Sequence, residues 1–208
     1  MHPLKQFDFF KDLSDDELKV ITFHTRTLMK NEIIGHRGEK CHQVGFIISG
    51  EIDMESINEN GDLQTMAKLT SGDCFGETLI FTSKAGYPGD VVCKGTTELI
   101  LFSKAEMSRL IMSNEKLFHK YATLMADKVT YLTERVRILG HKTLREKITT
   151  YLNTLSMKQG TKTITLPMSK EKLAVYLGTI RPSLVRELTN MKDEGLIDFD
   201  RKTITLLY

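Results

Sequence analysis

The pattern of apolar and polar residues divides the chain into a β-rich part and a helical part. Between Thr25 and Phe102, short β-rich runs such as residues 44–48, 51–54 and 98–102 recur. Turn signals at Gly38, Gly50, residues 60–61 and residues 71–73 separate them. Regular short strands joined by glycine turns indicate a β sandwich or barrel of the jelly-roll kind, which can hold a small ligand. A short helix that begins with a capping box at Ser14 and Glu17 precedes this region.

From about Lys104 the spacing becomes helical, and one apolar seam follows alternating steps of four and three. The seam consists of Phe118, Ala122, Met125, Val129, Leu132, Val136 and Leu139. Such spacing over three heptads predicts that the helix packs on its own barrel or meets a second copy across a two-fold axis. A long seam between two dissimilar domains favours the dimer. Gly140 then ends the helix and provides a hinge. Another helix with one apolar face is expected to follow.

Residues 168–188 predict two short helices around a tight turn. Ser169 caps the first helix and Gly178 ends it, while Thr179 is the expected cap of the second. Pro182 fits the first turn, where no intrahelical N–H is needed. Arg181, Ser183 and Arg186 are left facing solvent or DNA. An ordinary helical hairpin with a solvated face is the alternative interpretation.

The flanks of this hairpin favour a winged helix-turn-helix. Residues 162–166 alternate like a strand, and residues 196–199 and 203–206 form a second strand pair around the turn 200–202. In a winged helix the second helix reads bases and the basic hairpin tip contacts phosphate. The expected DNA-binding residues are Ser169, Thr179, Arg181, Pro182, Ser183, Arg186, Arg201 and Lys202.

Charge is distributed unevenly between the two parts. The 208 residues carry 29 Lys and Arg against 27 Asp and Glu, a net charge of +2. From His141 onward there are 12 basic and 7 acidic residues, or +5, which leaves 17 against 20, or −3, for the preceding residues. Positive charge therefore coincides with the predicted DNA-reading helix and favours attraction to phosphates.

The composition indicates a soluble, cytoplasmic protein. No run approaches the roughly 18 apolar residues that span a bilayer, and the first residues lack the apolar core of a secretory signal. Cys41, Cys74 and Cys93 are odd in number and widely separated, so reduced thiols are expected rather than a disulfide scaffold or a metal site. No nucleophile and base pair, metal-ligand spacing or phosphate loop indicates an enzyme.

Within the barrel, residues 72–77 form a Gly-Asp-Cys-Phe-Gly-Glu motif. A glycine beside a carboxylate allows close backbone approach to a polar ligand, and Glu77 can accept from ligand hydroxyls. A tight turn whose carboxylate caps backbone N–H groups explains the same spacing, and the residues favour that interpretation.

Together, this order of elements resembles the Crp/Fnr family of bacterial transcription regulators over nearly the whole chain. The resemblance implies an α+β protein with a jelly-roll barrel, a long dimerisation helix and a C-terminal winged helix-turn-helix. The expected boundaries are 1–103 for the effector-sensing β-roll, 104–139 for the dimerisation helix and 140–208 for the DNA-binding domain. It further implies a homodimer on a pseudo-palindromic operator, contact with RNA polymerase, and an unknown effector between barrel and helix.

The sequence departs from the cyclic-AMP-binding members of that family. Their Arg-Ser pair for the cyclic phosphate falls at Tyr87 and Pro88 here, and a buried anion without its cation costs several kcal/mol. The adenine-contacting Thr-Ser pair falls at about Leu132 and Thr133. Cyclic AMP is therefore not the expected ligand, although the region is still expected to hold another molecule. The expected pocket residues are Phe75, Gly76, Glu77, Tyr87, Pro88, Leu132 and Thr133.

The sequence also bears on three other sensor groups: an iron–sulfur cluster, haem and a redox-active cysteine. No cysteine precedes Cys41, so the N-terminal iron–sulfur cluster of the oxygen-sensing relatives is not expected. Haem stays open because a single histidine can ligate iron, although each histidine is expected at the surface. The histidines are His2, His24, His36, His42, His119 and His141. Cys74 is either a redox sensor beside the pocket or an inert core residue, and the second is favoured.

One residue of the reading helix departs from the family pattern. The family's glutamate after the first arginine of the reading helix is Pro182 here, so the usual half-site is not assumed.

The alternative to a DNA-binding regulator is a regulatory ligand-binding subunit without a DNA-binding role. The winged helix and the basic C-terminal part count against that alternative.

Overall fold

The computed structural model describes residues 2–58, 60–83 and 86–208. The chain divides into two compact units, Met1–Met125 and Ala126–Tyr208. The division falls inside the long helix α3 (Glu115–Leu139), whose halves therefore belong to different units. The three-segment boundaries expected from the sequence stay a prediction.

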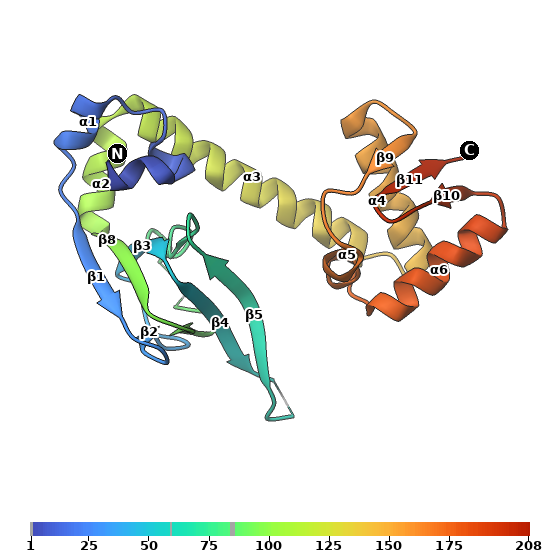
Figure 1. Cartoon of the computed structure of the whole chain (residues 1–208), viewed down its shortest axis with the longest axis horizontal. Coiled ribbons are helices and arrows are strands. Elements are labelled where there is room, and N and C mark those ends of the chain that lie inside the picture. Colours follow the sequence, from blue (N-terminus) through green and yellow to red (C-terminus); the bar gives the residue numbers. More distant parts are fainter. Residues whose placement is uncertain (1, 59, 84–85) are drawn as a thin grey trace. The chain divides into compact units, whose positions relative to one another are not determined.

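The first unit contains two four-stranded sheets with antiparallel pairing (Figure 1). One sheet has the order β1-β8-β3-β6 and the other the order β2-β7-β4-β5. The strands are β1 (His24–Leu28), β2 (Ile33–Gly35), β3 (Gln43–Ser49), β4 (Glu51–Ile57), β5 (Leu63–Thr70), β6 (Cys74–Phe75), β7 (Asp90–Cys93) and β8 (Thr97–Ser103). This arrangement confirms the β-roll predicted from short strands and glycine turns.

Two separate apolar cores stabilise this unit. The first is formed by residues of both sheets and of the segments that connect their strands: Leu28, Cys41, Ile47, Ile52, Phe75, Tyr87, Val91, Cys93 and Leu99. The second packs the 3-10 helices η1 (Pro3–Gln6) and η2 (Asp8–Phe10) against strands β3 and β8 through a cluster that includes Phe7, Phe10, Phe46 and Phe102. The N-terminal segment is thus an integral part of the unit.

Local capping signals determine where the first helices begin. Helix α1 (Asp15–Lys19) has the predicted capping box between Ser14 and Glu17. Helix α2 (Lys104–Ser113) has a second box, between Ser103 and Glu106, directly after β8. The change from strand to helix near Lys104 is therefore confirmed.

The predicted seam on α3 is largely exposed in the single chain. Exposed fractions are 71% for Val136, 63% for Val129, 57% for Leu132 and 53% for Phe118. Other side chains of α3 make the internal contacts, since Leu117 is buried in the first unit and Ile138 in the second. Burying an apolar row of this length is favourable, so the exposed seam is suited to pairing with a second copy.

The second unit contains three further helices and a three-stranded sheet of order β10-β11-β9 (Figure 1). Its elements are α4 (Leu144–Gln159), β9 (Thr163–Thr165), α5 (Lys170–Tyr176), α6 (Arg181–Asp193), β10 (Ile197–Phe199) and β11 (Thr203–Leu206). One core, which includes Ile148, Leu152, Leu173, Leu184 and Ile204, joins the helices to the sheet. The predicted winged helix-turn-helix is confirmed.

Candidate nucleic-acid interface

Helix α5 begins as its sequence predicts. The Ser169 hydroxyl accepts from the Lys172 backbone N–H at 3.3 Å. Leu173, Ala174 and Leu177 are buried, which fixes this helix on the core of the second unit. The side chains of its first turn are consequently held in place at the surface.

The cap of α6 differs from the prediction. The Thr179 N–H donates to the Ala174 carbonyl at 2.9 Å, so Thr179 belongs to the turn that closes α5. Gly178 allows this closure because its φ is +69°. The capping residue of α6 is Ile180, whose carbonyl accepts from the Leu184 N–H and whose side chain makes no capping bond. The expectation that Thr179 caps α6 is wrong.

Helix α6 presents a charged outer face and a buried inner face. Leu184 and Leu188 are fully buried, while Arg181 and Arg186 are exposed. Pro182 lies in the first turn as predicted, and Ser183 is half-buried. Ile180, at the start of the helix, is 66% exposed. Ile180 is not among the residues predicted from the sequence, because the neighbouring Thr179 matches the capping rule better.

The hairpin β10–β11 forms a wing with two cations at its tip. Asp200 accepts at 2.7 Å from the backbone N–H groups of both Lys202 and Thr203 and so shapes the turn. These backbone N–H groups, Thr203 first, hold the pKa of Asp200 below its usual value. Arg201 and Lys202 are exposed at the tip. The carboxylate therefore orders the turn that carries the two cations.

A groove joins the start of α5, the start of α6 and the wing. Four predicted DNA-binding residues line it: Ser169, Arg181, Arg201 and Lys202. The remaining lining is Thr165, Leu166, Pro167, Met168, Lys170 and Glu171. The sequence placed Lys170 and Glu171 directly after the cap, but it offered no signal that they face the beginning of α6. The lining does not include Thr179, Pro182, Ser183 or Arg186.

Helix α6 is fastened to α4 by a charged clamp. The Arg145 guanidinium donates to both carboxylate oxygens of Glu194 at 2.6 and 2.7 Å, and its Nε donates to Glu187 at 2.6 Å. Arg145 is the main reason that the pKa of Glu194 lies below its usual value. A bidentate guanidinium contact fixes geometry as well as charge, so the orientation of α6 follows that of α4.

In the barrel, the predicted ligand motif is part of the packed interior. Phe75 and Tyr87 are 2% and 5% exposed and share one core, and Glu77 is 5% exposed. Gly76 has a φ of +82°, and a Cβ there would lie 2.6 Å from the Gln43 carbonyl oxygen. Only glycine fits this close approach. Tyr121 of α3 donates its hydroxyl to the Glu77 carbonyl at 3.0 Å.

The other expected pocket residues are Pro88 in the first unit and Leu132 and Thr133 in the second. Pro88 is exposed, and Leu132 and Thr133 are exposed on the half of α3 that belongs to the second unit. Cys74 packs with the N-terminal phenylalanine cluster rather than with Phe75, since neighbouring strand residues face opposite sides. Within the first unit, Phe75 and Tyr87 share one core, and the expected pocket as a whole stays a prediction.

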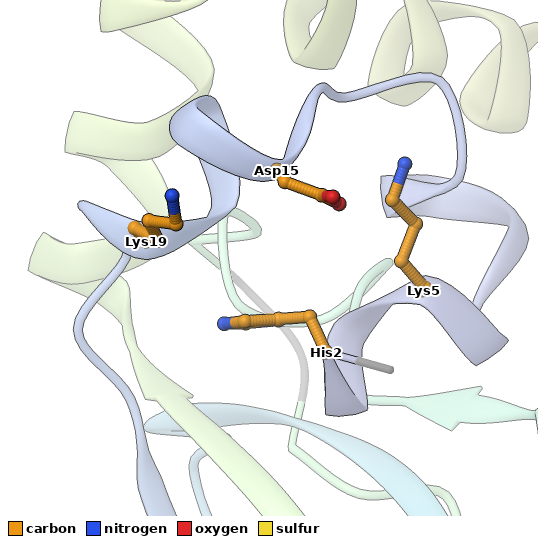
Figure 2. A pocket seen from close by; sticks show the side chains of 4 residues that line it. All are labelled: His2, Lys5, Asp15 and Lys19. Carbon is orange, nitrogen blue, oxygen red and sulfur yellow. The ribbon is translucent and has the colours of Figure 1, made fainter.

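A separate hollow of the first unit is lined by His2, Lys5, Asp15 and Lys19, and Figure 2 shows their side chains around it. None of the six histidines of the chain is buried. Within residues 2–58, 60–83 and 86–208, no group of three or more His, Cys, Asp or Glu side chains is arranged to hold a metal ion. No helix of that described part combines the length and apolar character needed to cross a bilayer.

A β-roll followed by a long helix and a winged helix-turn-helix defines the class of DNA-binding regulators with a sensor domain. Comparison with family models is consistent with this class: residues 25–114 match the cyclic nucleotide-binding domain, and residues 146–208 match the Crp-like helix-turn-helix domain. The chain belongs to the Crp/Fnr family, and its C-terminal domain is a DNA-binding domain of that family's type.

Curated relatives match along almost the entire chain. The Probable transcriptional regulator flp of Lacticaseibacillus casei is 25% identical over 201 residues, which cover 95% of this chain and 90% of that protein. The cAMP-activated global transcriptional regulator Vfr of Pseudomonas aeruginosa is 22% identical over 191 residues, covering 88% of this chain and 89% of that one. Both are described as transcriptional regulators.

Solved structures share the fold. CprK in complex with OCPA has a TM-score of 0.62 at 18% identity, with 89% of this chain and 85% of CprK covered. The catabolite activator protein of Thermus thermophilus has a TM-score of 0.52 at 20% identity, with 95% and 92% covered.

Proposed function

We propose that this protein is a homodimeric regulator that reads a specific pseudo-palindromic DNA sequence with helix α6 and contacts the backbone with its wing. The observation that carries the proposal is that Arg181 of α6 lines one groove with the wing-tip residues Arg201 and Lys202, while Arg186 is exposed further along the same helix. Arginine bonds O6 and N7 of guanine in one plane, whereas wing cations neutralise phosphates. The site joins both kinds of contact on one surface.

The remaining interface residues have supporting roles in this proposal. Ser169, Thr179 and Ser183 offer hydroxyl groups to phosphate or base edges near the ends of the two helices. Pro182 and Ile180 add an apolar surface at the start of α6, which suits a thymine methyl group. Because Pro182 supplies no carboxylate for cytosine N4, the half-site differs from one that depends on such a contact.

Dimerisation through α3 completes the proposed DNA-binding unit. The exposed seam of Phe118, Val129, Leu132 and Val136 buries itself against a second copy, together with Ala122, Met125 and Leu139. A two-fold dimer presents two reading helices about 34 Å apart, one turn of DNA. This spacing matches a pseudo-palindrome.

Control of the dimer is assigned to the barrel. An effector that binds the N-terminal unit favours one arrangement of the DNA-binding domains by binding that arrangement more tightly. Tyr87 and Pro88 stand where the resemblance places the Arg-Ser pair for a cyclic phosphate, and Tyr87 is buried in the barrel core, so the proposed effector is not cyclic AMP. Contact with RNA polymerase, by analogy with the family, and a cytoplasmic regulatory rather than enzymatic role complete the proposal.

Binding-site selection from a random duplex pool, followed by salt titration, tests the proposal. A pseudo-palindromic consensus with affinity above that for random DNA at every salt concentration is expected. Equal affinity for all sequences would contradict sequence-specific regulation. Native mass spectrometry of the protein from its own host tests for a bound effector or haem.

A further inference from the structure

The DNA-facing groove contains one negative charge, which is unfavourable for binding phosphates. Among its ten lining residues, Lys170, Arg181, Arg201 and Lys202 are cations, and Glu171 is the only carboxylate. Phosphates approaching the groove are attracted by the four cations of its lining and repelled by Glu171, while the other nearby carboxylate, Asp200, is bonded to backbone N–H groups of the wing turn outside the lining. A glutamine or serine at this place would serve non-specific DNA binding better.

Glu171 lies against the first arginine of the reading helix. Its Oε1 is 2.9 Å from Nε of Arg181, across the turn between α5 and α6. The exposed fraction of the side chain is 62% for Glu171 and 60% for Arg181. Ion pairs at such exposure add little to folding stability, so stability does not account for the pair.

The geometry of the contact leaves the reading edge of Arg181 available. Glu171 contacts the guanidinium through its Nε side, whereas Nη1 and Nη2 form the end that bonds O6 and N7 of guanine. A side chain held by a neighbour loses less conformational entropy when it binds. A phosphate, by contrast, attracts the guanidinium from any side and must compete with the carboxylate.

We propose that Glu171 is a positioning residue for Arg181 and thereby sets the discrimination between the operator and other DNA. It orients the guanidinium for a base, and its charge weakens binding to phosphates of unrelated sequence. This inference rests on the proposed function, because it requires Arg181 to face a base edge.

Glu171→Gln tests the inference because it removes the charge and keeps the shape. The selected operator and a random duplex are titrated with each protein over a range of salt. The variant is expected to bind random DNA more tightly, with the slope of log affinity against log salt steeper by about 0.9, the value of one phosphate contact. The ratio of operator to random affinity is expected to fall by roughly fivefold or more, the low end for one bidentate base contact.

Two controls separate positioning from simple charge. Asp193→Asn removes the same charge from the exposed end of α6, outside the groove lining, and is expected to leave the ratio unchanged. In an Arg181→Ala background, Glu171→Gln is expected to have no further effect on the ratio. Thermal melting of each variant checks that the fold is retained.

The outcomes are distinct. Equal changes in operator and random affinity for Glu171→Gln, or the same loss of ratio in Asp193→Asn, overturn the positioning role while leaving the proposed function intact. A wild-type protein that selects no sequence overturns the proposed function and this inference together.

Discussion

The aromatic ring of Tyr87 lies directly over Gly35, so closely that a Cβ on Gly35 would be 2.4 Å from Cε2 of the ring. Tyr87 is 5% exposed and belongs to the core shared by both sheets. Burial, and then the neighbouring Cys41 thiol, raise the pKa of its phenol. Tyr87 is therefore a neutral structural element of the barrel.

Gly35→Ala is expected to destabilise the protein by about 1–3 kcal/mol, because the new methyl group overpacks a closed core. Urea unfolding followed by circular dichroism measures the change. Gly95→Ala is the matched control, since a Cβ at Gly95 meets nothing within 4 Å. Similar losses in both variants would argue against the close packing of Tyr87.

Arg186→Ala is expected to weaken operator binding by about 1–3 kcal/mol and to relax one base position, if Arg186 reads a base edge. Repeating the binding-site selection with the variant identifies that position. Arg201→Ala serves as the comparison, because a wing phosphate contact weakens operator and random DNA alike. Equal losses on both DNAs for Arg186→Ala would make it a phosphate contact.

Leu132→Lys is expected to convert the dimer to a folded monomer. The side chain is 57% exposed in the single chain, so the substitution leaves the monomer's core intact while placing a charge in the proposed seam. Analytical ultracentrifugation gives the mass, and circular dichroism gives the helix content. Thr130→Lys, at an exposed position beside the seam, is expected to remain dimeric. A dimeric Leu132→Lys protein would place the interface elsewhere.

Glu17 links stability to pH. The Ser14 backbone N–H first, and then Lys116 and Asn114, lower the pKa of its carboxyl from 4.5 to about 2. A lowered folded-state pKa contributes stability above the unfolded-state value, and this contribution is lost as the pH falls from about 4.5 towards 2. The melting temperature of the wild type is therefore expected to exceed that of Glu17→Gln at pH 6. The difference between the two melting temperatures is expected to be smaller at pH 3. A constant difference would contradict the linkage.

Local signals made most of the fold predictable. Ser14 and Ser169 cap helices through bonds to residues three positions away, and Gly195 ends α6 with a φ of +72°. Such contacts are read directly from neighbouring residues. The seam on α3 could also be predicted from the sequence, because helical periodicity alone determines which side chains share a face.

The candidate site was less predictable, because it depends on contacts across turns. Thr179 matches the capping rule, but its N–H is used to close α5, and only the three-dimensional turn shows this. Glu171 and Arg181 are ten residues apart, so their contact depends on how α5 and α6 pack. Cys74 was expected beside the pocket that includes Phe75 or as an inert core residue, and the pleat of β6 sends the two side chains to different cores.

The clamp formed by Arg145, Glu187 and Glu194 restricts how a regulatory signal can act. With α6 joined to α4 by three charge-assisted bonds, the reading helix cannot tilt on its own without breaking them. In the proposed dimer, a regulatory signal is therefore expected to change the separation and rotation of two rigid DNA-binding bodies. Such a switch would select the spacing of half-sites along the DNA rather than the bases within each half-site.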